Sequence, residues 1–275
     1  MAFSAAIERF AAHCRQVGAL RARDPLPVSD SVRAFLQNPQ LLVARFEPAC
    51  THYVAHTDEG DISLRGLTTT MSRHFYPDWH YTGGGLEGRG AAGGAAAGIA
   101  FEARVAAAYG LAAGVPPRMH ATIPDPAALG DADTARAVRL FASLNIVPVA
   151  YQTVLYDPEL RIGSGCDFIG YNVVTHRVVF VELKHGFNGY SDRACGNMRW
   201  PFEEFTDAPT NQHQMQVAFA LHAACTFYGL PREQAEGYVL RVDNAGGWHR
   251  ALDARMETVY PVARIFLRCL DDLGV

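Results

Sequence analysis

The pattern of hydrophobic and polar positions changes along the chain, and its first part is typical of helices. Residues 4–22 place apolar side chains at helical spacing, as an amphipathic helix does. A second helix is predicted over residues 31–44, and a mixed polar stretch follows to about residue 66. We therefore expect residues 1–82 to form an accessory region that is mainly helical, as an N-terminal helical extension of the fold.

Glycine and alanine dominate the next segment, residues 83–96, which we interpret as a connector. Within it Gly88, Gly90 and Gly93 match the G-x-G-x-x-G pattern of dinucleotide-binding loops. That pattern normally follows a strand, and TGGGLE does not resemble one. A nucleotide-binding enzyme is therefore the less favoured alternative.

From residue 97 the pattern predicts an α/β fold in which a mixed central sheet is flanked by helices. The period of the apolar positions is helical at first and changes to two after residue 144. The predicted elements are helices over 97–113 and 131–144, strands over 147–156, 166–172 and 178–184, a helix over 211–229, a strand over 237–242 and a helix over 257–272. We expect residues 97–275 to form the core.

The second and third strands read as a hairpin whose loop is centred on residues 174–175. A symmetric loop pairs Tyr171 with Val178, Ile169 with Phe180 and Asp167 with Glu182. Side chains two residues apart on a strand share a face, so Lys184 lies on the same face as these six. Directly opposed Cβ atoms lie about 4.5 to 5.5 Å apart, which brings the two acids together.

Composition singles out the amine beside these acids. The chain has 24 basic residues, of which 23 are Arg and one, Lys184, is Lys. The two cations differ most where a compact point charge is needed. One ammonium group does not balance two carboxylates that repel each other, and this deficit predicts a divalent-metal site. The simpler interpretation is an ordinary ion pair in which Lys184 bridges Asp167 and Glu182.

The two strands also resemble the core motif of a known superfamily. GSGCDFIGYN followed by VVFVELKHG is similar to the PD-(D/E)XK nucleases, in which an Asp opens the second strand and E-x-K ends the third. The resemblance covers roughly residues 95–245. It implies a restriction-endonuclease-like core of order α-β-β-β-α-β and a Mg²⁺-dependent deoxyribonuclease, with Mn²⁺ as a substitute ion. Asp167 and Glu182 would be metal ligands with the carbonyl oxygen of Leu183, and Lys184 would be the catalytic cation.

Three further motifs extend the resemblance toward RecB-like, viral recombination or resolvase-like members. Gly98-Ile-Ala-Phe-Glu102 is similar to the G-x-x-x-E of the first core helix, so Glu102 would assist the metal. Residues 161–167 resemble the G-x-x-D entry to the acidic strand. Residues 211–216 resemble the Gln motif, in which Gln216 would approach the attacking water or the phosphate, with Gln212 as its neighbour on one helix face.

A long loop over residues 185–210 follows the E-x-K strand and is rich in Gly, aromatic residues and Arg. Arg193 and Arg199 are candidates for holding backbone phosphate, and Trp200 for stacking on an unpaired base. Arg161 is a further phosphate candidate. A self-packed surface loop is the alternative, and we interpret His213 as a plain surface residue.

Charge and cysteine content narrow the setting. A net charge of -4 excludes a whole-surface electrostatic grip on nucleic acid, so DNA binding must rely on a local groove, a protein partner or a homo-oligomer. Six scattered cysteines without a C-x-x-C pair indicate a reducing intracellular location, the cytoplasm or the nucleus. A viral origin of the protein is left open. The chain contains no run of 18 apolar residues, so the sequence predicts no membrane-spanning helix. A catalytically silent DNA-binding or assembly module of the same fold is the main alternative.

Overall fold

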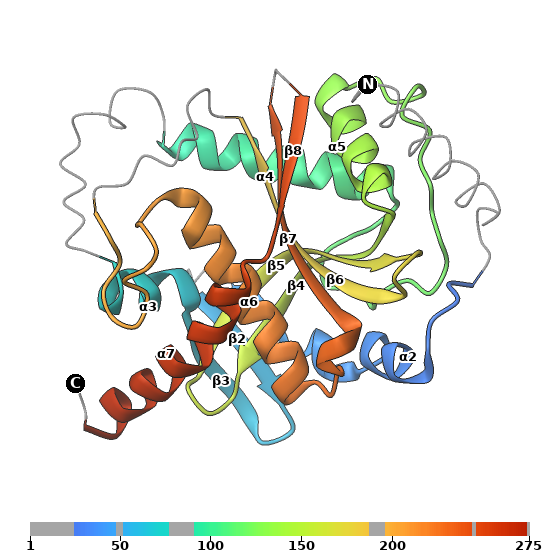
Figure 1. Cartoon of the computed structure of the whole chain (residues 1–275). Coiled ribbons are helices and arrows are strands. Elements are labelled where there is room, and N and C mark those ends of the chain that lie inside the picture. The colour runs from blue at the N-terminus through green and yellow to red at the C-terminus, as the bar shows by residue number, and fades with distance from the viewer. Residues whose placement is uncertain (1–24, 48–51, 77–90, 187–195, 244–245, 274–275) are drawn as a thin grey trace.

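The chain forms a mixed eight-stranded sheet with helices on both of its faces (Figure 1), so the expected α/β class is confirmed. The computed structural model describes residues 25–47, 52–76, 91–186, 196–243 and 246–273. The helix predicted over residues 4–22 lies outside these ranges. No helix within them is long and apolar enough to cross a membrane.

Strands replace much of the helix expected in the N-terminal part. Helix α2 (Asp30–Leu36) and the 3-10 helix η1 (Pro39–Leu42) are followed by an antiparallel meander of β1 (Ala44–Glu47), β2 (His52–Thr57) and β3 (Gly60–Gly66). The helix predicted over 31–44 is therefore present only in its first part, and the mixed polar stretch to residue 66 contains strands. The proline at position 39 cannot continue α2. Gly60, with φ of 122°, closes the two-residue turn between β2 and β3.

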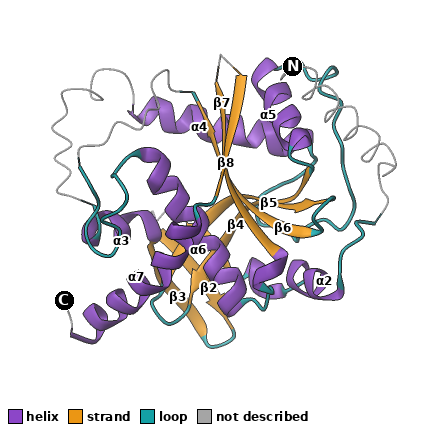
Figure 2. Ribbon diagram, viewed as in Figure 1, coloured by secondary structure: helices purple, strands orange, loops and turns teal. Residues whose placement is uncertain are grey.

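The elements predicted after residue 97 are present with shifted ends, and Figure 2 shows how the helices surround the strands. In chain order the elements after β3 are α3 (Leu67–His74), α4 (Ala91–Ala108), α5 (Ala132–Ser143), β4 (Ile146–Asp157), β5 (Ile162–Asn172), β6 (Arg177–His185), α6 (Pro209–Phe227), η2 (Arg232–Gln234), β7 (Ala235–Asp243), β8 (Gly246–Ala251) and α7 (Ala254–Leu273). Of these, α3, η2 and β8 were not predicted. Helix α4 begins by Ala91, so the end of the predicted connector 83–96 is helical. Alanine, the best helix former, outweighs glycine there.

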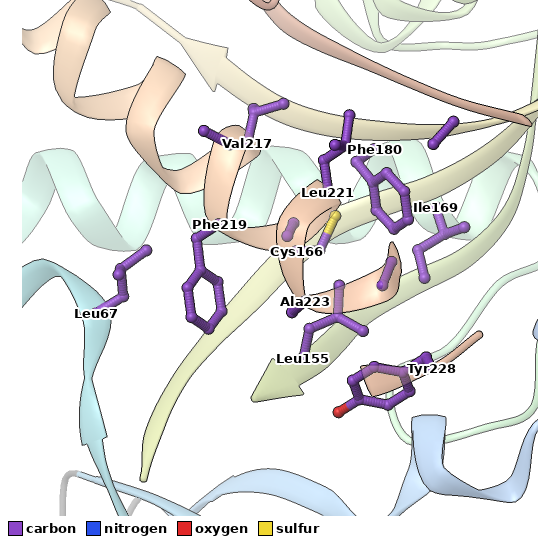
Figure 3. Close-up of a cluster of buried hydrophobic side chains, with 14 of the residues drawn as sticks. Leu67, Leu155, Cys166, Ile169, Phe180, Val217, Phe219, Leu221, Ala223 and Tyr228 are labelled. Carbon is purple, nitrogen blue, oxygen red and sulfur yellow. The ribbon is translucent and has the colours of Figure 1, made fainter. Parts of the chain in front are cut away.

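Two apolar cores lie on the two faces of the sheet. Helices α6 and α7 cover one face, and Figure 3 shows Ile169 of β5 and Phe180 of β6 beside Leu221 of α6. Helices α4 and α5 cover the other face, where Phe101 and Phe141 are fully buried. Strands of the middle of the sheet are therefore buried on both sides, which explains their nearly continuous apolar runs.

Gly237 lets α6 approach the sheet closely. A Cβ added at this position would lie 2.4 Å from Cγ1 of Val217 on α6 and 3.3 Å from Cβ of Leu252. We expect Gly237→Ala to lower the free energy of unfolding by about 1.5 kcal/mol, because the packed neighbours must shift. Chemical denaturation measures this. Gly130→Ala is the control, since a Cβ there meets nothing within 4 Å, and equal effects of the two would contradict the close contact.

Candidate active site

The acidic residues lie at a fork in the sheet. Strand β4 pairs with one edge of β5 over nearly its whole length. On the other edge, β3 pairs with residues 162–163 and β6 with residues 168–172. On this edge, residues 164–167 therefore pair with neither β3 nor β6. We call them the unpaired gap of β5, and Asp167 is its last residue. Strands that diverge in this way leave room for side chains at the level of the sheet itself.

The predicted hairpin register is confirmed, and it brings the two acids together. Tyr171 pairs with Val178 and Ile169 with Phe180, and the ladder ends one residue before Asp167 and Glu182.

Lys184 contacts both of these acids. Its Nζ lies 2.6 Å from Oε1 of Glu182 and 3.3 Å from Oδ2 of Asp167. The backbone N–H of Leu183 donates a second hydrogen bond to Oδ2 of Asp167 at 2.8 Å. The orientation of the Asp167 carboxylate is thus fixed by two donors, the Lys184 ammonium group and the Leu183 N–H, and its negative charge strengthens both hydrogen bonds.

Glu102 joins the cluster through a residue that the sequence did not indicate. Nε2 of Gln152 lies 3.0 Å from Oε2 of Glu102 and 3.2 Å from Oδ1 of Asp167, and it donates to both. Gln152 has a left-handed backbone with φ of 50°, at the point where the β4–β5 ladder skips the pair with Asp167. This irregularity turns the amide toward the acids, in the way that β-bulges redirect side chains.

Burial and mutual repulsion dominate the electrostatics of the site. Burial raises the pKa of Glu102 to about 8, and the negative charge of Asp167 adds to the effect. Burial and Asp167 also raise the pKa of Glu182 to about 7, although Lys184 opposes them. Burial disfavours the charge of Lys184, but the surrounding carboxylates outweigh burial and raise its pKa. The amine is therefore held as a cation.

The cluster lacks positive charge. It holds three carboxylates and one ammonium group, so full ionisation leaves an excess of negative charge. Arg241, the register neighbour of Lys184 on β7, places its guanidinium 3.1 Å from the Gly186 carbonyl oxygen and 3.8 Å from Asp243. Either a proton or a further cation must supply the missing charge.

The donor chemistry of the cluster fits a hard divalent cation. Carboxylate and carbonyl oxygens are the ligands that Mg²⁺ and Mn²⁺ prefer. The carboxylates of Glu102, Asp167 and Glu182 are held here by Gln152 and Lys184. In the part of the chain that the structure describes, no group of three or more His, Cys, Asp or Glu side chains has the arrangement of a metal site.

Helix α6 contributes a histidine near the cluster. Burial lowers the pKa of His213 well below its usual value, and the positive charge of Lys184 adds to this. The interpretation of His213 as a plain surface residue is therefore wrong.

The two glutamines predicted on α6 make no contact with the acids in the described residues. Gln212 donates from Nε2 to the carbonyl oxygen of Asp207 at 2.8 Å, just before the start of α6. Gln216 is half-buried and makes no hydrogen bond within the described ranges, so its role stays a prediction.

The remaining candidates for DNA contact do not join the cluster. Arg161 lies at the β4–β5 turn, six residues from Asp167 along β5, which corresponds to about 20 Å. Arg161 is therefore not part of the acid cluster, and its contact with a DNA phosphate stays a prediction. Arg193 lies outside the described residues. The backbone N–H of Arg199 donates to the carbonyl oxygen of Phe75, and the half-exposed Trp200 packs edge-on against Phe266 of α7.

Tyr53 of β2 also reaches the site, although no sequence pattern pointed to it. Its hydroxyl accepts a hydrogen bond from the backbone N–H of Gly165 at 3.3 Å. Burial raises its pKa, and the negative charges of Glu182 and Asp167 contribute. The two residues of this bond are 112 positions apart in the chain, which is why no local pattern could predict it.

Comparison with known proteins adds no assignment. No protein-family model matches the chain, and no curated protein matches it either. The function must therefore be inferred from the geometry of the fork and its residues.

Proposed function

We propose that the chain is a metal-dependent nuclease of the PD-(D/E)XK type that hydrolyses phosphodiester bonds of DNA. The observation that supports this most is the contact of Lys184 with both Glu182 and Asp167 at a fork of the sheet, with Glu102 joined to them. Three acids with one cation repel one another, which lowers the stability of the folded chain. A bound metal ion would relieve this repulsion and give the cluster a function.

Each residue of the fork has a role in this proposal. The carboxylates of Asp167, Glu182 and Glu102 and the carbonyl oxygen of Leu183 would hold Mg²⁺ or Mn²⁺. The bound ion would lower the pKa of a water molecule and neutralise charge on a phosphate oxygen. Gln152 fixes the orientation of two carboxylates through its amide group.

Lys184 supplies a fixed positive charge in the proposed reaction. Its raised pKa keeps it protonated, so it serves as a donor rather than as a base. From Nζ it would donate a hydrogen bond to the attacking water or to a non-bridging phosphate oxygen, where negative charge develops. Gln216 of α6 would orient the same water or phosphate. Arg193, Arg199 and Trp200 are proposed to contact the DNA outside this centre.

The direct test is cleavage of DNA by the purified full chain. We expect linear DNA to be degraded with Mg²⁺ or Mn²⁺ and to stay intact with EDTA, because the three carboxylates cannot act on a phosphate without a cation. Closed-circular DNA tested alongside distinguishes an endonuclease, which cuts it, from an exonuclease, which does not. Cutting at an unchanged rate in EDTA would overturn the metal dependence. Binding of DNA without any cutting would indicate the silent module instead.

A further inference from the structure

The N-terminal meander places two aromatic side chains beside the fork. Tyr53 of β2 and Phe46 of β1 are paired across the two strands, and their rings lie 5.4 Å apart in an edge-on arrangement. The Tyr53 hydroxyl is bonded to Gly165, two residues before Asp167 in the unpaired gap of β5. Two strand residues correspond to about 7 Å, so the phenol lies close to the acids.

Glycines of β5 lie against this tyrosine and its neighbours. A Cβ at Gly163 would lie 3.1 Å from Cδ1 of Leu64 and 3.4 Å from Cβ of Tyr53. A Cβ at Gly165 would lie 3.3 Å from Oε1 of Gln152 and 3.7 Å from the Tyr53 hydroxyl. The tight contacts are those with Leu64 and Gln152, and the Tyr53 hydroxyl lies at ordinary van der Waals distance.

The Tyr53 hydroxyl is suited to donate a hydrogen bond. Its oxygen already accepts from Gly165, and its raised pKa keeps the proton on the oxygen at neutral pH. A neutral donor can bind a phosphate oxygen without competing with a cation for the neighbouring carboxylates. An additional Arg or Lys at this point would compete for them, because it would pair with the acids.

Phe46 extends the aromatic pair to the edge of the sheet. Strand β1 is the edge strand, and the Phe46 side chain is 48% exposed although it is large and apolar. An exposed aromatic ring next to a phosphate-binding position is the arrangement that single-stranded nucleic acid uses, since every base has a face that can stack.

We infer that Tyr53 and Phe46 bind the DNA strand that is cut, with Tyr53 donating to a phosphate oxygen next to the scissile bond and Phe46 stacking on an unpaired base. This inference rests on the proposed nuclease function and adds the substrate class to it, a strand whose bases are unpaired near the cut. The meander is then part of the DNA-binding surface rather than an accessory.

The test compares binding and cleavage of single-stranded and duplex oligonucleotides by Tyr53→Phe, Phe46→Ala and Tyr228→Phe. Tyr228 is the matched control, because its hydroxyl accepts from the backbone N–H of Tyr156 at 3.1 Å in the same way, but away from the acids. Fluorescence anisotropy with Ca²⁺ in place of Mg²⁺ measures binding. We expect KM and Kd for the single strand to rise about tenfold in Tyr53→Phe and Phe46→Ala, with the wild-type values in Tyr228→Phe.

The outcomes separate the two proposals. If the wild type cuts DNA and the two site variants bind and cut the single strand as well as it does, the inference fails while the nuclease proposal stands. A loss that Tyr228→Phe shares would also overturn the inference, since it would reflect stability alone. If the wild type neither binds nor cuts DNA, both proposals fail. Weaker binding of the single strand in both site variants, with duplex binding unchanged in Phe46→Ala, would support the inference.

Discussion

Lys184→Arg is expected to fold normally and to lose at least about 10²-fold in the rate of DNA cleavage, the scale of removing one preorganised donor. The substitution keeps the charge, so a role that needs only an ion pair would be preserved. A guanidinium is planar and binds a carboxylate through two parallel hydrogen bonds. With Glu182 at 2.6 Å from the present amine, Arg would bind that carboxylate and withdraw it from the metal.

Two measurements make this prediction specific. Circular dichroism and thermal unfolding show whether the variant is folded, and the Mg²⁺-dependent cleavage rate shows what it lost. Lys184→Met is the companion variant, because it removes the charge at similar length and should also be inactive. Arg104→Lys is the control for exchanging one cation for the other, because the exposed Arg104 of α4 forms an ion pair with Asp131, outside the site. Full activity in Lys184→Arg would show that the amine has no catalytic role.

The hairpin of β5 and β6 was predictable because its information is local. Alternation with a period of two defines the faces, and a short loop fixes the register, so the meeting of Asp167 and Glu182 followed from residues 166–184 alone. The helices around the sheet followed from their apolar periodicity in the same way. Their ends were less predictable, because caps and neighbouring packing decide them.

The fork itself was not predictable, because it depends on contacts between distant parts of the chain. Strand β3 joins β5 over only two residue pairs, and no pattern in the sequence marks that pairing. Gln152 acts from a left-handed position inside a strand, which alternation cannot reveal. Helix α6 is buried on nearly all sides, so its periodicity did not show which side faces the acids, and His213 was misplaced for that reason.

The acid cluster also predicts how stability depends on pH when no metal is bound. The pKa of Glu102 is about 8 in the folded chain against an ordinary value of 4.5, so between these values the folded state holds a proton that the unfolded state has lost. The free energy of unfolding then falls as pH rises. Below pH about 6.5, His74, His213 and His222 oppose this, because burial lowers their pKa values. They therefore bind protons on unfolding in this range, and their contribution to stability rises with pH. The clear window is therefore about pH 6.5 to 8.

In EDTA we expect the free energy of unfolding to fall by about 2 kcal/mol across this window, since one proton contributes about 1.4 kcal/mol per pH unit. Glu102→Gln should remove most of the slope, and Glu233→Gln, at an exposed position outside the site, should keep it. Mg²⁺ replaces the proton as the missing charge, so it should stabilise the wild type more at pH 8 than at pH 6.5. At a hundredfold excess over Kd the gain is about 2.7 kcal/mol. Denaturant titrations at several pH values measure both effects. Glu182, with a pKa of about 7, still contributes to the slope at the lower end of this window. An undiminished slope between pH 7 and 8 in Glu102→Gln would mean that the unbalanced charge lies elsewhere.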